Sequence, residues 1–167
     1  MKSGLADIIA FDGNRDDLYR EIGRFVFEYS QLEADLRNLF RSMIGYDREH
    51  ANIISTGFDF SRLCAALLAA SAIDEGGKPD REFAKIVSRC QRINEIRVAV
   101  VHGRWSSTYG GDRAIHVSKG SMKPTNYFEF EGELDGKSDE IVRLRQDLKN
   151  CAVAIKASEK PKRRKKS

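Results

Sequence analysis

Apolar residues recur at helical spacing along the first part of the chain. Between residues 18 and 43 they are spaced alternately by four and by three positions: Leu18, Ile22, Phe25, Tyr29, Leu32, Leu36, Leu39 and Met43. This spacing predicts one long helix whose apolar side packs against neighbouring helices at shallow angles. Asn14 is expected to cap its start, and Gly45 is expected to end it in a left-handed conformation.

Three further helices are predicted before residue 103. A short helix covers about 47–54, an alanine-rich helix covers about 59–73, and a longer one covers 80–102 before Gly103. The apolar row of the longer helix is Phe83, Val87, Cys90 and Ile93. Each of these helices therefore has an apolar side that the bundle can bury.

The period changes from Arg104 onward. Segments 104–109, 113–118 and 126–131 predict three short strands separated by turns, with Phe128 and Phe130 on the covered side of the third strand. Ser138 then caps a last helix with apolar residues at Ile141, Leu144, Leu148, Cys151 and Ile155. The predicted fold is mainly α: an up-and-down helical bundle of four to five helices, with a small β-meander at about 104–134 inserted before the last helix.

The chain has 167 residues, which fits one domain, predicted to cover 1–157, followed by a disordered basic tail at 158–167. Of the formal net charge of +4, residues 156–167 contribute +6, which leaves residues 1–155 at −2. The tail can hold RNA through counterion release, and the alternative is a solubilising tail without a specific partner. The basic tail residues are Lys160, Lys162, Arg163, Arg164, Lys165 and Lys166.

Several classes of protein are not expected from the sequence. No run reaches the roughly 18 apolar residues of a membrane span, and the N-terminal stretch is too short and too acidic for a signal peptide. A cytoplasmic protein without membrane contact is therefore predicted. Cys64, Cys90 and Cys151 stand far apart and are odd in number, which indicates core residues and neither a disulfide framework nor a zinc site. No metal or other cofactor is expected.

Arg97 and His102 are the strongest candidates for chemistry, since they interrupt the otherwise apolar last turns, 96–102, of helix 80–102. Five positions on a helix separate two residues by about 140° around the axis and about 7.5 Å along it, so the two do not share one face. Asn94, Val98 and Val101 lie on the arc between them. Val98 and Val101 form a second apolar surface, which predicts a dimer interface with another copy of the chain.

A structural role for Arg97 is the alternative to a functional one. A buried guanidinium is costly unless it is paired or opens to a binding site. Glu33 on the first helix is a candidate partner that would make Arg97 a structural bridge.

Three segments together resemble one known family. Residues 94–105 (NEIRVAVVHGRW) contain an arginine, four residues and a histidine, and 29–37 (YSQLEADLR) and 56–63 (TGFDFSRL) precede them. The chain resembles the HEPN (higher eukaryotes and prokaryotes nucleotide-binding) superfamily, helical bundles with an arginine and a histidine at four to six intervening residues near the end of a long helix. The resemblance covers most of residues 15–105 and the last helix.

The resemblance implies a homodimer in which the two motif helices meet and form a metal-independent endoribonuclease site. Arg97 would neutralise the phosphate, and His102 would act as general base or acid for attack by the RNA 2′-hydroxyl. Cleaving relatives often have a polar residue directly after the arginine, where this chain has Val98, and Asn94 is a candidate to support the site instead.

A nucleic-acid-binding protein whose only functional part is the basic tail is one interpretation, and two further interpretations of the function remain open. The first is an endoribonuclease or RNA-binding protein of a bacterial defence or toxin-type system. The second is a catalytically inactive dimeric scaffold or regulatory module that engages a cognate protein partner.

Overall fold

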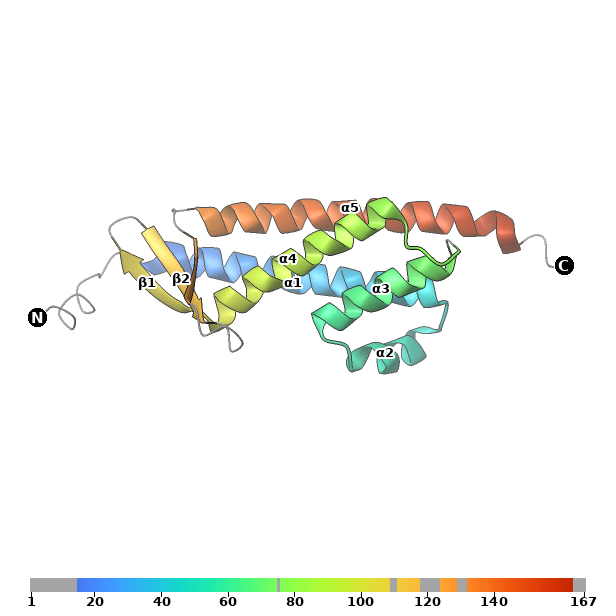
Figure 1. The fold of residues 1–167 in the computed structure, drawn as a ribbon, viewed down its shortest axis with the longest axis horizontal. Coiled ribbons are helices and arrows are strands. Elements are labelled where there is room, and N and C mark those ends of the chain that lie inside the picture. The colour runs from blue at the N-terminus through green and yellow to red at the C-terminus, as the bar shows by residue number, and fades with distance from the viewer. Residues whose placement is uncertain (1–14, 75, 109–110, 118–123, 129–131, 164–167) are drawn as a thin grey trace, which may run out of the picture.

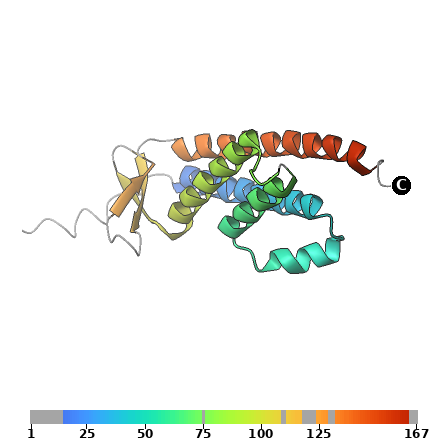
Figure 2. The same ribbon diagram turned by 45° about the vertical axis from the view of Figure 1, so that its right-hand side comes forward.

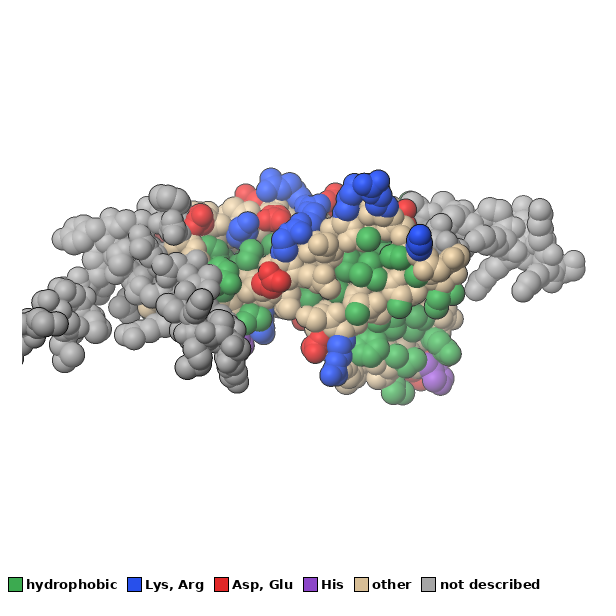
Figure 3. Space-filling model, viewed as in Figure 1, with side chains coloured by type: hydrophobic (Ala, Val, Ile, Leu, Met, Phe, Trp, Pro, Cys, Tyr) green, Lys and Arg blue, Asp and Glu red, His purple; other side chains and the backbone are tan. Residues whose placement is uncertain are grey.

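The computed structural model describes residues 15–74, 76–108, 111–117, 124–128 and 132–163 (Figure 1). Its elements in chain order are α1 (Arg15–Ile44), α2 (Arg48–Thr56), α3 (Phe60–Asp74), α4 (Arg81–His102), β1 (Arg104–Thr108), β2 (Gly111–Val117), β3 (Pro124–Tyr127) and α5 (Glu133–Arg163). The mainly α class predicted from the sequence is confirmed. Charged side chains lie on the surface over several helices (Figure 3), and none of the described helices has the length and apolar character needed to span a membrane.

Consecutive helices reverse direction, so that α1, α3 and α5 run one way while α2 and α4 run the other (Figures 1 and 2). The two longest helices, α1 and α5, lie side by side. Arg145 of α5 donates hydrogen bonds of 2.8 Å to both Glu28 and Asp35 of α1, and Arg24 of α1 pairs with Asp135 at the start of α5. Residues later in α1 therefore pair with residues later in α5, which is the pattern expected for two parallel helices.

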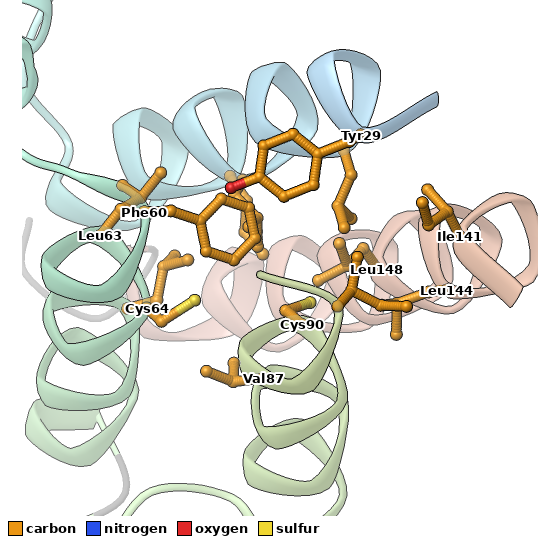
Figure 4. Close-up of a cluster of buried hydrophobic side chains, with 14 of the residues drawn as sticks. Tyr29, Phe60, Leu63, Cys64, Val87, Cys90, Ile141, Leu144 and Leu148 are labelled. Carbon is orange, nitrogen blue, oxygen red and sulfur yellow. The ribbon is translucent and has the colours of Figure 1, made fainter. Parts of the chain in front are cut away.

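The core lies between α1, α3, α4 and α5 (Figure 4). The inner members of the predicted α1 row are buried, while Leu18, Ile22 and Met43 near its ends are partly covered. Gly45 ends α1 at φ +69°, as predicted. Cys64 and Cys90 are buried free thiols in this core, and burial raises the pKa of Cys64 to about 12. Both cysteines therefore act as apolar filler.

The three strands form an antiparallel sheet in the order β1-β2-β3 at one end of the bundle. Trp105 of β1 joins this sheet to α4, because its Nε1 donates a 3.0 Å hydrogen bond to the Val100 carbonyl. Its ring stacks on Phe128 with centroids 5.7 Å apart and an interplanar angle of 3°. Trp105 is thus engaged in packing.

The third strand differs from the predicted segment 126–131. It begins at Pro124 and ends at Tyr127, because Phe128 adopts a φ of +61°, which ends the extended conformation while its ring turns into the core. Phe130 lies outside the described residues, so its predicted orientation stays a prediction.

The start of α5 was predicted wrongly. The helix begins at Glu133, five residues before Ser138. Ser138 is buried inside the helix, where its hydroxyl donates a 3.1 Å hydrogen bond to the Leu134 carbonyl one turn earlier. Leu134 is itself buried, so the first turn of α5 is already anchored in the core.

The end of α5 also differs from the predicted boundary at 157. The helix continues to Arg163, which includes Lys160 and Lys162. Lys, Arg, Ala and Glu in this stretch have high helix propensity, and they extend the helix past Pro161, which itself removes one backbone hydrogen bond. The side chains of these last basic residues, and residues 164–167 with Arg164, Lys165 and Lys166, lie outside the described part of the chain.

Candidate functional site

The second half of α4 has the two apolar surfaces that the sequence predicts. Ile93, Ala99 and Val100 are buried in the core. Val98 is half-buried and Val101 is 45% exposed, so the second surface is open in the single chain. Arg97 and His102 flank this open surface at positions about 140° apart around the helix.

Arg97 is held by an aromatic ring. Its guanidinium carbon lies 5.7 Å from the centroid of the Tyr29 ring of α1, within the range of a cation–π interaction. Among the described residues, no carboxylate forms an ion pair with Arg97. Glu33, the predicted structural partner, instead accepts a 2.7 Å hydrogen bond from Arg37. The Arg97–Glu33 bridge is therefore not formed in the chain.

Arg37 explains why Glu33 is engaged elsewhere. Its guanidinium also donates to the backbone carbonyls of Ser55, at 2.6 Å, and Phe58, at 3.0 Å. Arg37 thus fixes α1 to the connection between α2 and α3. Glu33 supplies the opposite charge for this structural arginine.

Asn94 lies at the meeting point of three helices. Its Oδ1 accepts a 2.7 Å hydrogen bond from the Tyr29 hydroxyl of α1, and its Nδ2 donates a 3.4 Å bond to Ser61 Oγ of α3. The Tyr29 ring also stacks on Phe60 of α3 at 5.1 Å (Figure 4). The Asn94 side chain therefore supports the packing of Tyr29.

The electrostatic surroundings of Tyr29 keep its hydroxyl protonated. Burial raises the pKa of Tyr29 most, the negative charge of Glu33 raises it further, and the positive charge of Arg97 opposes both. A neutral phenol can donate to Asn94 while its ring faces the cation. Tyr29 is the functional neighbour that the sequence does not single out, although it is the only member of the α1 apolar row with a polar tip.

His102 is the last residue of α4 and is exposed. The Gly103 N–H donates a 2.8 Å hydrogen bond to the Ala99 carbonyl. Gly103 itself has an extended backbone conformation, which ends the helix where the sequence predicts. The imidazole is therefore free to meet a ligand or another chain. Within one chain, helix geometry keeps it away from Arg97.

His50 does not extend this site. His50 Nδ1 lies 2.6 Å from the carboxylate of Asp47, which caps α2, and the side chain of His116 lies outside the described residues. No group of three His, Cys, Asp or Glu side chains suited to a metal ion occurs in the described part of the chain.

Comparisons with family models, curated proteins and solved structures find no match for the chain. The likeness to HEPN proteins therefore rests on the residues and spacing given above.

Proposed function

We propose that the chain is a HEPN-like dimeric domain that binds RNA and cleaves it without a metal ion, with Arg97 and His102 as its site. The observation that carries the proposal is the state of Arg97. Arg97 is half-buried with its guanidinium on the Tyr29 ring, and no described carboxylate forms an ion pair with it. Partial burial of an arginine without a counter-charge is costly unless an anion binds. Phosphate matches the planar, multiple donors of a guanidinium.

The dimer supplies what a single chain lacks. His102 and Arg97 point to different sides of α4, so one chain cannot aim both at one phosphate. In a symmetric dimer the same surface of both copies meets, and each His102 can approach the partner's Arg97. Val98 and Val101, which lie between them, supply the apolar contact.

The chemistry uses the 2′-hydroxyl of RNA as the nucleophile. One His102 takes its proton, the 2′-oxygen bonds to the adjacent phosphorus, and the bond to the 5′-oxygen breaks. The second His102 donates a proton to that leaving oxygen, which gives a 2′,3′-cyclic phosphate and a 5′-hydroxyl. Arg97 stabilises the extra negative charge on the phosphoryl oxygens in the transition state. The basic residues after position 157 add affinity that does not depend on sequence.

The test is cleavage of RNA by purified protein in the presence of a chelator. His102→Ala and Arg97→Ala are expected to abolish cleavage, whereas His50→Ala, which changes an exposed histidine of α2, is expected to retain it. Circular dichroism of each variant checks the fold. Equal activity in wild type and His102→Ala would overturn the enzymatic proposal.

One observation favours a second candidate, a catalytically inactive dimeric scaffold or regulatory module with a cognate protein partner. Val98 replaces the polar residue that often follows the arginine in cleaving relatives. Asn94, the candidate replacement, is occupied by Tyr29 and Ser61. A dimer that neither cleaves nor binds RNA, and that loses stability in Arg97→Ala, would support this second candidate.

A further inference from the structure

A row of basic residues follows the outer side of α4. Arg81, Lys85, Arg89 and Arg92 are spaced by four, four and three positions, which places them on one side of the helix over about 16 Å. Arg81, Lys85 and Arg92 are exposed, and Arg89 is half-buried at the contact with α5. Figure 3 shows basic side chains on the face that α4 and α5 share, with acidic side chains among them.

α5 adds a fifth cation to this row. Arg89 Nη1 donates a 2.6 Å hydrogen bond to Asp147 Oδ2 and so joins the two helices. α4 and α5 run in opposite directions (Figure 1). One turn after Arg89 on α4 and one turn before Asp147 on α5 therefore lead to the same side of this pair. The residues at these two positions are Arg92 and Arg143, both of them exposed. Arg92 and Arg143 thus lie on one side of the Arg89–Asp147 pair, which supplies a third arginine.

The positive charge of this face is balanced only in part. Lys85 pairs with Glu82 at 2.7 Å, but both side chains are largely exposed and such a pair contributes little. Arg81, Arg92 and Arg143 form no ion pair with a carboxylate in the part of the chain that the structure describes. Of the five cations, Lys85 and Arg89 are therefore paired and the other three form no such pair. Glu95, three positions after Arg92 and exposed, is a further carboxylate on this part of α4.

We infer that this α4–α5 basic face, formed by Arg81, Lys85, Arg89, Arg92 and Arg143, binds the phosphate backbone of single-stranded nucleic acid. A linear row of cations at about 6 Å intervals suits a polymer that carries one charge per repeating unit. Arginine binds phosphate and carboxylate alike with two parallel hydrogen bonds, so the regular spacing of the row is what favours a phosphate backbone over a scattered set of carboxylates.

The face is separate from the proposed Arg97 and His102 site. Arg92 and Val101 are nine positions apart, which places them about 180° apart around α4. A dimer formed through Val101 therefore leaves the basic face open on both copies. The inference goes beyond the proposed function, because it assigns a binding surface that does not depend on catalysis.

The test measures binding of a labelled oligonucleotide of about twenty thymidines, which lacks the 2′-hydroxyl needed for cleavage. Arg92→Gln/Arg143→Gln in the full chain is expected to weaken binding roughly tenfold at about 50 mM salt. The slope of log K against log salt should become shallower by about 1.4, or about 0.7 for each lost contact. Arg20→Gln/Arg62→Gln removes the same charge from two arginines that are each 73% exposed elsewhere, and is expected to leave the slope unchanged.

Equal affinity and equal slope in the two double variants would overturn the inference. It would also be overturned if vesicles containing phosphatidylserine bind through Arg92 and Arg143 while the oligonucleotide does not. The proposed function fails independently: a protein that binds the thymidine oligonucleotide through this face but cleaves no RNA contradicts the enzymatic proposal alone.

Discussion

The Tyr29 hydroxyl donates a 2.7 Å hydrogen bond to Asn94 Oδ1. The same ring lies 5.7 Å beneath the guanidinium carbon of Arg97, one turn further along α4. One side chain of α1 thus contacts two residues of the candidate motif from within the core. Any shift of α4 along α1 would move Arg97 relative to the ring that supports it, so the candidate site depends on the packing of these two helices.

Tyr29→Phe removes the hydroxyl but keeps the ring. Asn94 Oδ1, which is only partly accessible, then loses its protein donor, so the free energy of unfolding is expected to fall by about 1–2 kcal/mol. Tyr29→Leu also removes the contacts with Phe60 and Arg97 and is expected to cost roughly 1–2 kcal/mol more. Urea denaturation of the three proteins measures both steps, and a Phe variant as stable as wild type would contradict the role of the hydroxyl.

The same tyrosine predicts a loss of stability at alkaline pH. Burial raises the pKa of Tyr29 above the value of about 10 that it has in the unfolded chain. The contribution of the neutral Tyr29 hydroxyl to the free energy of unfolding is therefore complete below about pH 10, and it is lost as the pH rises toward the folded-state pKa. The unfolding free energy should decline less steeply above pH 10 in Tyr29→Phe than in wild type. Urea titrations from about pH 8 to pH 11 test this, and parallel declines would contradict it.

The sequence predicts helices well where apolar spacing alone decides them. The alternating spacing from Leu18 to Met43 forms α1, whose inner residues are buried, and Gly45 and Gly103 end α1 and α4 as expected. Burial of one apolar side is a property of each segment by itself. These elements could therefore be predicted without knowing their neighbours.

Details that depend on contacts between segments were not predictable. Ser138 has the chemistry of a helix cap, but the burial of Leu134 starts α5 one turn earlier, and the hydroxyl bonds inside the helix. The partner of Arg97 is a similar case. Glu33 and Tyr29 lie four positions apart on the same side of α1, so a shift of one turn between α1 and α4 decides which of them Arg97 meets. Apolar spacing does not fix that shift.

The ion pairs between α1 and α5 are expected to differ in strength. Arg145 is 20% exposed and contacts Glu28 and Asp35, whereas Arg24 is 41% exposed and contacts Asp135 and Asp139. Arg145→Met leaves two partly buried carboxylates without their cation and is expected to lower the unfolding free energy by about 2–3 kcal/mol. For Arg24→Met, where solvent screens the pair, the expected loss is much smaller.

Urea denaturation of both arginine variants at low and high salt separates the two cases. The small effect of Arg24→Met should shrink further in high salt, because exposed charges are screened, while that of Arg145→Met should largely persist. Equal losses in the two variants would show that burial does not set the strength of these contacts.

The apolar surface of α4 that contains Val98 and Val101 allows a direct test of the proposed dimer. Val101 of α4 and Val142 of α5 are both 45% exposed, so replacing either with aspartate removes a similar apolar area. In a symmetric dimer formed through α4, Val101→Asp places two carboxylates near the two-fold axis, where they repel each other and lose hydration. Val142 lies outside that surface, and Val142→Asp should leave the dimer intact.

Sedimentation velocity across a range of protein concentrations, with circular dichroism as a check of folding, measures both variants. The expected result is a folded monomer for Val101→Asp and a dimer for Val142→Asp. A dimer in both variants would place the interface elsewhere on the chain. It would also remove the reason for bringing His102 of one copy to Arg97 of the other, because helix geometry keeps these two residues apart within a single chain.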